Sequence, residues 1–358
     1  MKKYFYKIAT DQITGFPTAC LKAFLLFLSF VYGLAVKGLL LFYRKGFLKV
    51  YRLPRKVISV GNITLGGTGK TPLVEFIARS LSEKGIRPVI LIRGYMSGGR
   101  KPASLEGPIS DEAVYLRKAL GDVPVLVGAD RVKSARSLAP GYPVDVFILD
   151  DGFQQWGLAR DLEIVAINTA NPFGNRFLLP RGILREPLSS LARSDVFVLT
   201  KTDQGGENIR DIREELSQRN PRALIVEARH CPRDFLNLRT MERVGLSGLG
   251  GQDIGSFCSI GDPHSFELSL NSVGVKVKRN FVFLDHHVYQ AQDIRLMNEF
   301  CRANGIKFLV TTEKDSAKLG SWLDSFESDV CLLALRVTLE MASGKKEFLD
   351  RAFDLFRS

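Results

Sequence analysis

The chain has 358 residues with 45% apolar and 25% charged side chains, a composition that excludes a disordered, collagen-like or polytopic membrane chain. Its net charge of +12 is unevenly spread. Residues 1–56 hold eleven Lys and Arg and one acid, Asp11, for a net +10 that leaves +2 for the rest. A basic face across the whole fold, typical of nucleic-acid binders, is not indicated, and we expect no nucleic-acid partner. At roughly 150 residues per domain, the length favours two domains.

The N-terminal segment contains an apolar stretch, residues 23–36, bracketed by Lys22 and Lys37. As a helix it would be about 21 Å long, shorter than a hydrocarbon core of about 30 Å. Extending it to Tyr43 would allow it to span, with Lys37 inside the bilayer. A signal peptide fits poorly, because no small-x-small cleavage site follows. Three alternatives stay open: an interfacial helix, a spanning helix, or a helix packed on the protein's own body. We favour the interfacial helix, with aromatic rings in the acyl boundary and lysines on anionic headgroups.

The core opens with the signature of a phosphate-binding loop. Residues 57–60 predict a buried strand, a glycine-rich stretch follows, and an amphipathic helix ends near Gly85. Glycines allow backbone N–H groups to surround phosphate oxygens, and a helix N-terminus adds positive potential. The predicted nucleotide-binding residues are Thr64, Leu65, Gly66, Gly67, Thr68, Gly69, Lys70 and Thr71. Thr64 departs from the strict spacing, which requires glycine there.

Two side chains of this loop have predicted chemical roles. Lys70 is expected to reach the β- and γ-phosphates of a nucleotide, and the Thr71 hydroxyl to bind Mg²⁺. The metal also needs a carboxylate at the end of a neighbouring strand. Residues 144–149 are mainly apolar and are followed by Asp150 and Asp151, either of which can serve as that ligand.

The remaining elements predict an α/β fold: a P-loop NTPase core with a parallel sheet, a second, smaller α/β domain, and an N-terminal membrane-associating helix. Further strands are expected at 88–92, 162–167, 195–200, 223–227, 256–259 and 308–312, and later helices at 263–270, 291–304 and 345–356. The glycine-dense residues 245–251 indicate a linker. The predicted divisions are 1–50 (membrane-associating segment), 51–240 (P-loop domain), 241–255 (linker) and 256–358 (second domain). Five scattered cysteines without metal-ligand spacing predict free thiols.

One motif favours a different function. Thr200, Lys201, Thr202 and Asp203 match the [NT]-K-x-D pattern with which GTPases read guanine. The expected D-x-x-G is absent from the metal strand, where Asp150, Asp151 and Gly152 are consecutive. A membrane-associated GTPase switch is therefore the principal alternative to a kinase, and a catalytically silent ATP-binding adaptor is a third.

A longer set of motifs resembles the tetraacyldisaccharide 4′-kinases of lipid A biosynthesis, from about Tyr43 to Lys318. In chain order these motifs are VGNITLGGTGKTP, RGY from Arg93, Asp111-Glu112, GADRV, DDGFQ, LARDLEIV, LPRGILREP, IGDP from Ile260, DHH from Asp285 and TTEKD from Thr311. Each motif is weak alone, whereas the order and spacing are specific. Gln155 and Ser259 depart from the residues usual in this family.

The resemblance implies transfer of the γ-phosphate of ATP, with Mg²⁺, to the 4′-hydroxyl of an acylated glucosamine disaccharide 1-phosphate. It implies that Asp111 accepts the hydroxyl proton and that His286 assists; His287 stays an alternative, although His286 directly follows Asp285. Glu112 is expected to help hold the metal. Expected phosphate contacts are Arg93, Arg131 and Arg185.

The resemblance also implies a location and an arrangement. The enzyme is expected at the cytoplasmic face of the bacterial inner membrane, peripheral or anchored by its N-terminus. Its partners are expected to be the acylated disaccharide and an anionic membrane surface, which suits a basic, apolar N-terminal segment on a nearly neutral body. With the P-loop on one domain and His286 on the other, the site is expected in a cleft between them.

Overall fold

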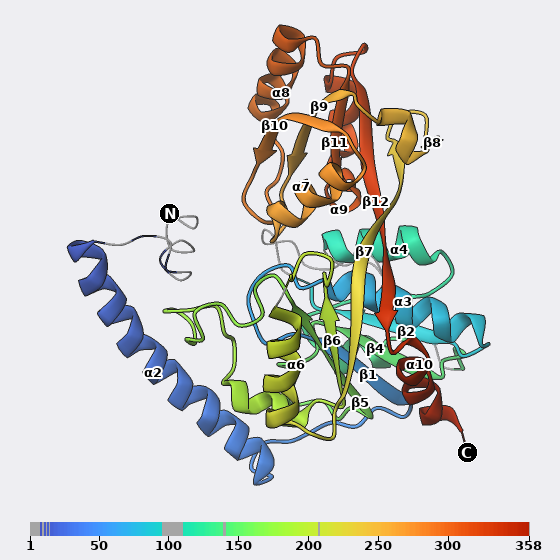
Figure 1. Ribbon diagram of the computed structural model, residues 1–358. Coiled ribbons are helices and arrows are strands. Elements are labelled where there is room, and N and C mark those ends of the chain that lie inside the picture. Colours follow the sequence, from blue (N-terminus) through green and yellow to red (C-terminus); the bar gives the residue numbers. More distant parts are fainter. Residues whose placement is uncertain are drawn as a thin grey trace. The chain divides into compact units, whose positions relative to one another are not determined.

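The structure, a computed structural model, describes residues 15–94, 110–138, 141–206 and 208–357, together with Ile8, Asp11 and Ile13. Tyr95 of the RGY motif lies outside the described residues. The chain forms two compact units (Figure 1). The first contains Met1–Arg229 and Met341–Ser358, and the second contains His230–Glu340.

The first unit is built on a parallel sheet, as predicted, and its strand order is β7-β6-β5-β1-β4-β2-β3. Its strands are β1 (Lys56–Gly61), β2 (Pro88–Ile92), β3 (Val125–Val127), β4 (Val146–Asp150), β5 (Leu162–Asn168), β6 (Val196–Thr200) and β7 (Leu224–Asn237). Every residue of β2, β4, β5 and β6 is buried. Parallel strands covered on both faces read as continuous apolar runs, which is why these strands could be predicted from sequence.

Helices follow the strands of this unit, as parallel connections require. They are α3 (Lys70–Glu83), α4 (Asp111–Leu120), α5 (Arg131–Arg136) and α6 (Asn208–Arg219). Helix α3 buries Leu73, Val74, Ile77 and Leu81 at helical spacing, which fixes this helix against β1, β2 and β4. The helix that begins at the phosphate-binding loop is therefore rigidly placed.

The second unit has a smaller sheet in which β10, β9, β11 and β12 pair in parallel. Its strands are β8 (Arg243–Val244), β9 (Asp253–Cys258), β10 (Lys276–Val282), β11 (Phe308–Thr312) and β12 (Cys331–Ser343). Its helices are α7 (Pro263–Ser272), α8 (Ala291–Asn304) and α9 (Glu313–Ser316). A core that includes Phe257, Met297 and Leu309 supports the sheet. All five cysteines of the chain are free thiols, which confirms that prediction.

The units do not divide where the composition suggested. The second unit begins inside β7, at His230, and ends inside β12, at Glu340, so two continuous strands connect it to the first unit. The glycine-dense stretch contains a 3-10 turn, Leu246–Leu249, with Leu249 buried in the second unit's core, so it connects elements of that unit. Strands that cross a boundary carry no glycine or proline signal, which explains the difference from the predicted 241–255 linker.

The C-terminal helix also belongs elsewhere than predicted. Helix α10 (Lys345–Phe353) follows β12 and lies in the first unit. Phe348 is 1% exposed, and its ring centroid lies 6.2 Å from that of Phe76 on α3. Its amphipathic pattern predicted a helix but could not indicate which core its apolar face covers.

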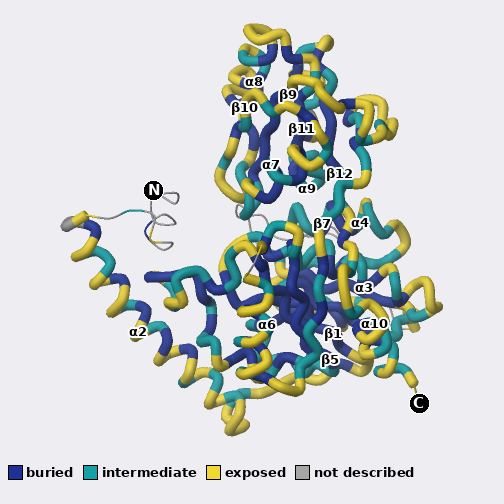
Figure 2. Tube along the Cα trace, viewed as in Figure 1, coloured by how far each residue is buried: buried dark blue, intermediate teal, exposed yellow. Residues whose placement is uncertain are grey.

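Helix α2 (Phe16–Arg44) has 29 residues, about 44 Å at 1.5 Å per residue, and is much longer than the apolar stretch alone suggested. A narrow stripe that includes Leu25, Ser29 and Val36 is buried against the first unit. The other faces expose large apolar side chains, among them Phe24, Phe27, Phe30, Leu34, Leu41 and Phe42. Figure 2 shows exposed and buried positions alternating along α2. Only 22% of its most apolar window is buried, and by length and composition the helix could cross a membrane. Packing wholly on the protein's own body is therefore excluded.

Candidate active site

The phosphate-binding loop connects β1 to α3 and lies at the carboxyl edge of the first unit's sheet. Gly69 precedes the helix with φ of +76°, a left-handed conformation that favours glycine. Gly61 ends β1, where a Cβ atom would lie 2.4 Å from the Cβ of Phe153. Because β1 and β4 pair in parallel, with Val60 opposite Asp150, the loop and the acids after β4 reach the same edge. This is the arrangement that the sequence predicted.

Two cations and one carboxylate meet beside the loop. The Lys70 Nζ donates to Asn62 Oδ1 at 3.1 Å and lies 3.6 Å from Asp151 Oδ1. The Arg185 guanidinium donates to both carboxylate oxygens of Asp151, at 2.7 and 3.2 Å, and to Asn62 Oδ1 at 3.2 Å. Lys70 and Arg185, both predicted phosphate contacts, are thus brought together by Asn62 and Asp151. A bound phosphate could replace these partners, because both cations bind phosphate oxygens well.

The two adjacent acids have different environments. Burial raises the pKa of Asp150 to about 6, and the negative charges of Asp151 and Glu112 act in the same direction while Lys70 opposes them. Burial also disfavours ionisation of Asp151, but Lys70 and Arg185 outweigh it and lower the pKa to about 2. Asp151 is therefore an ion-paired carboxylate, whereas the described side chains form no salt bridge with Asp150. Its charge calls for a cation.

The oxygen atoms around Asp150 fit a magnesium ion that is shared with a nucleotide. The Thr71 Oγ lies 3.3 Å from Asp150 Oδ2, so the two predicted ligands are neighbours. Within the described ranges, no three His, Cys, Asp or Glu side chains are grouped to hold a metal by themselves. Mg²⁺ at nucleotide sites uses one or two protein ligands and takes the others from phosphates and water. The side chains suited to hold it are Thr71 and Asp150, with Glu112 near enough to shift the Asp150 pKa.

Arg131 has a different position from the one expected of a phosphate contact. Its side chain begins α5 and is 1% exposed. The guanidinium donates to the backbone carbonyls of Asp150 and Asp151, at 2.5 and 3.2 Å, and to Gln155 Oε1 at 3.1 Å. We therefore correct the expectation: Arg131 holds the turn that carries both acids. It also contacts Gln155, one of the two positions that depart from the family's usual residues.

Replacement of Arg131 by methionine is expected to lower the free energy of unfolding by about 2–4 kcal/mol, because buried carbonyl groups lose their donors. The midpoint of urea denaturation measures this change. Arg136→Met, on the exposed surface of the same helix, is the matched control and should shift the midpoint little. Equal shifts in both variants would contradict the assignment.

Arg93 and Asp111 both follow strand β2 in the chain: Arg93 directly, and Asp111 at the start of α4. Asp111 opens α4, but the capping residue is Ser110, whose Oγ accepts from the Ala113 N–H at 3.2 Å. The helix cap is therefore Ser110, and Asp111 is an acid of the first turn. Arg93 is exposed, and its positive charge lies near enough to Arg131 to lower the pKa of that guanidinium. The structure thus leaves Arg93 accessible to an anionic ligand.

The second unit distinguishes the two histidines. His287 Nε2 is 2.8 Å from Asp293 Oδ2, and its ring stacks on Phe283 at 4.8 Å. The His286 side chain is 47% exposed, and the residue has a φ of +60°. The backbone N–H of His286 donates to Ser259 O at 3.2 Å. His287 thus supports the local fold, while His286 is presented at the surface of its unit. Asp111 lies in the first unit and His286 in the second, so their joint action stays a prediction.

Three residues that support the phosphate-binding loop were not assigned to this site from the sequence. Asn62 contacts Lys70 and Arg185, and its only signal was its place in the VGNITLGGTGKTP motif. Thr200 Oγ donates to Thr68 O at 2.9 Å, and Lys201 Nζ donates to Gly67 O at 3.0 Å. Both residues are buried. Thr200 and Lys201, of the motif that resembles a guanine-reading motif, therefore support the phosphate-binding loop by hydrogen bonds to its backbone carbonyls.

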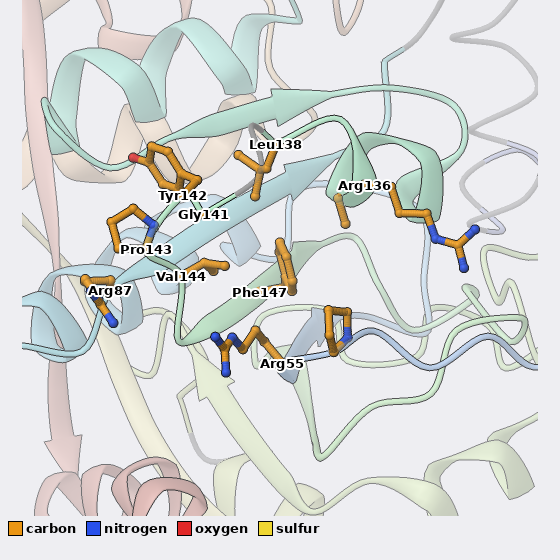
Figure 3. Close-up of a pocket in the computed structure, with 11 residues that line it drawn as sticks. Arg55, Arg87, Arg136, Leu138, Gly141, Tyr142, Pro143, Val144 and Phe147 are labelled. Atoms are coloured by element: carbon orange, nitrogen blue, oxygen red, sulfur yellow. The ribbon is translucent and has the colours of Figure 1, made fainter.

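A separate hollow of about 690 Å³ lies at the opposite edge of the sheet (Figure 3). It is lined by residues that immediately precede β1, β2 and β4, including Arg55, Arg87 and Val144. The phosphate-binding loop instead follows the carboxyl end of β1. Ligands of parallel α/β sheets bind at the carboxyl ends of the strands, so this hollow is not the nucleotide site.

A parallel sheet, a phosphate-binding loop with Lys70 and Thr71, and a carboxylate at the end of the next strand define a P-loop nucleotide-binding protein. Comparison of sequences makes the assignment specific. The tetraacyldisaccharide-1-P 4′-kinase family matches residues 21–354, and the chain belongs to this family.

Characteristic relatives agree with this assignment. A tetraacyldisaccharide 4′-kinase of Desulfatibacillum aliphaticivorans is 34% identical over 357 residues, covering 95% of this chain and 94% of the relative. One of Halothermothrix orenii is 35% identical, with 85% of each chain covered. A crystal structure of LpxK from Aquifex aeolicus in complex with ATP has a TM-score of 0.72 and 29% identity, and covers 94% of this chain and 100% of that one.

Proposed function

We propose that this protein is a kinase that transfers the γ-phosphate of ATP to the 4′-hydroxyl of a tetraacyldisaccharide 1-phosphate in lipid A biosynthesis. The observation that carries the proposal is the cluster of Lys70, Arg185, Asp151 and Asn62 at the phosphate-binding loop. Membership of the kinase family supplies the reaction. The family match also favours this function over the GTPase switch suggested by residues 200–203.

Charge neutralisation is the first requirement of phosphoryl transfer. Lys70 would leave Asn62 and Asp151 to bind the β- and γ-phosphates, and Arg185 would bind a phosphate oxygen from the other side of Asp151. Arg131 would keep the carbonyl groups of Asp150 and Asp151 fixed during this exchange. A preorganised cluster of this kind stabilises the developing charge without reorganisation of solvent.

The proposed magnesium ion would supply further neutralisation when bound together with the nucleotide. Thr71 and Asp150 are the side chains proposed to hold it, with Glu112 as a more distant support. Asp151 would keep its ion pair with Arg185 after Lys70 turns to the phosphates, and this pair would keep its carboxylate ionised. This divides the duties of the adjacent acids.

The acceptor hydroxyl must lose its proton as the new phosphate ester forms. We assign the proton to Asp111, the acid that opens α4, and propose that His286 orients or relays it. Burying the reacting groups away from bulk water would favour transfer to the alcohol over hydrolysis. We propose His286 rather than His287, because the His287 ring is engaged by Asp293 and Phe283.

The acceptor is proposed to be an acylated lipid at the cytoplasmic face of the inner membrane. Helix α2 supports this location through its exposed aromatic and aliphatic side chains, together with the basic residues around it. The same helix offers either interfacial or spanning attachment. In both cases the P-loop unit would stay next to its lipid substrate.

The test is incubation of the purified chain with γ-labelled ATP, Mg²⁺ and the acylated disaccharide 1-phosphate, followed by analysis of the lipid product. We expect label at the 4′ position and little turnover without the lipid. Competition between ATP and GTP is measured in parallel. Preferential GTP hydrolysis without labelled lipid would reject the kinase and support the GTPase alternative.

A further inference from the structure

Helix α2 is joined to the first unit by two side-chain hydroxyl groups. Ser29 Oγ donates to Leu178 O at 2.7 Å and accepts from the Arg181 N–H at 2.9 Å. Tyr32 Oη donates to Arg185 O at 2.8 Å. The helix also approaches closely at Gly33, directly after Tyr32, where a Cβ would lie 2.8 Å from Leu178 Cδ1. Tyr32 and Gly33 lie three and four positions after Ser29, so each shares a face of the helix with Ser29.

The segment that receives these hydrogen bonds also forms part of the phosphate-binding site. The Leu65 N–H donates to Ile183 O, and the Arg185 N–H donates to Ile63 O, both at 2.8 Å. Residues 183–185 therefore pair with the start of the phosphate-binding loop. Arg185 then extends its guanidinium to Asp151 and Asn62. One residue thus accepts a hydrogen bond from the apolar helix through its carbonyl and contacts the catalytic cluster through its side chain.

An anchor alone does not require these hydroxyl groups. Most of α2 is apolar, and its exposed faces provide the surface expected of a membrane anchor. Ser29 is 4% exposed, so its hydroxyl must be satisfied by the protein rather than by water. The Tyr32 hydroxyl is half-buried and donates to the Arg185 carbonyl. The polar contacts therefore specify where the helix lies against residues 178–185.

We infer that Tyr32 and Ser29 are positioning residues for phosphoryl transfer: through them, the membrane-associating helix fixes Arg185 beside Asp151 and the phosphate-binding loop. The inference rests on the proposed kinase function and extends it. Helix α2 would then have two separable roles. Its exposed apolar faces attach the protein to lipid, and the hydroxyl groups of Ser29 and Tyr32 align Arg185. Loss of these hydroxyl groups should impair catalysis without detaching the protein from lipid.

The principal experiment compares Tyr32→Phe with Tyr43→Phe in the full chain. Both remove one hydroxyl from the same helix and keep the ring. The Arg185 carbonyl accepts from Tyr32, whereas Tyr43 lies eleven positions further along α2 and its ring packs on Trp156, 6.3 Å between centroids. Tyr32→Phe should lower kcat about fivefold, the scale of one neutral hydrogen bond, while Tyr43→Phe stays near wild type. Sedimentation with vesicles of anionic phospholipid and KM for the lipid acceptor should be unchanged in both.

A double-mutant cycle tests whether Tyr32 acts through Arg185. In an Arg185→Lys background, Tyr32→Phe should cause little further loss of kcat, because the residue that it positions has already been altered. Gly33→Leu gives a second perturbation: it keeps the helix apolar but places a large side chain against Leu178. We expect lower kcat with retained sedimentation. Thermal denaturation of each variant identifies any that fail to fold.

Several outcomes would overturn the inference. An active wild type with kcat equal in Tyr32→Phe and Tyr43→Phe would reject the positioning role while leaving the proposed function intact. Reduced sedimentation and raised lipid KM in Tyr32→Phe, with normal kcat, would assign Tyr32 to anchoring instead. Additive losses in the double-mutant cycle would separate Tyr32 from Arg185. A wild-type chain that labels no lipid would reject the proposed function and, with it, this inference.

Discussion

Replacement of Lys70 by methionine is expected to lower kcat for lipid phosphorylation by about 10³-fold or more, since the transferring phosphate loses its principal cationic contact. In the structure, the Lys70 ammonium already lies beside Asn62 and Asp151, at the mouth of the loop. Methionine keeps much of the side-chain volume and removes the charge. The measurement is label transfer from γ-labelled ATP at saturating concentrations of both substrates.

Lys84→Met is the matched control for this variant. Lys84 caps the opposite end of the same helix, α3, and is exposed, so its replacement should leave kcat within about twofold of wild type because surface substitutions are usually small in effect. Thermal denaturation should show that both variants fold. Substantial lipid phosphorylation by Lys70→Met would show that the loop does not bind the reacting phosphate in the proposed way.

Replacement of Asp111 by asparagine is expected to lower kcat by about 10²- to 10⁴-fold, the range for loss of a general base. Asparagine has nearly the same shape but cannot accept the hydroxyl proton as a carboxylate does. Because Ser110 caps α4, the helix should form normally, and ATP affinity should change little. Equilibrium binding of ATP and the kcat for lipid phosphorylation together separate a chemical role from a structural one.

The control for this variant lies just beyond the other end of α4. Asp122→Asn makes the same chemical change on an exposed side chain and should leave both measurements near wild type. If Asp111→Asn keeps full activity, the base must be sought elsewhere. If it loses ATP binding and activity in parallel, Asp111 supports the nucleotide site rather than the acceptor proton.

The phosphate-binding loop and its sheet were predictable because their signals are local. An apolar strand, a glycine-rich turn and a helix that starts at Lys70 are adjacent in the chain, and parallel strands buried on both faces appear as continuous apolar runs. The acids at the end of β4 were predictable for the same reason. Parallel pairing then places the ends of neighbouring strands at one edge.

The partners of these residues were not predictable from local signals. Arg131 and Arg185 both appeared as free phosphate ligands, since an arginine has the same pattern whether its guanidinium is buried or exposed. Only the fold shows that Arg131 closes on backbone carbonyls while Arg185 pairs with Asp151. The residues of each contact are separated by 19 and 34 positions, so neither periodicity nor spacing reports it.

The concentration of positive charge in residues 1–56, the apolar character of that segment and the chemistry of the loop were determined by the sequence itself, because each depends on residues close together in the chain. Tertiary structure decided the rest. It separated His286 from His287 and gave Asp150 and Asp151 different charge environments, because burial and pairing depend on residues distant in sequence. It also brought the apolar N-terminal helix, through one tyrosine hydroxyl, to the carbonyl of Arg185, a contact between residues 153 positions apart.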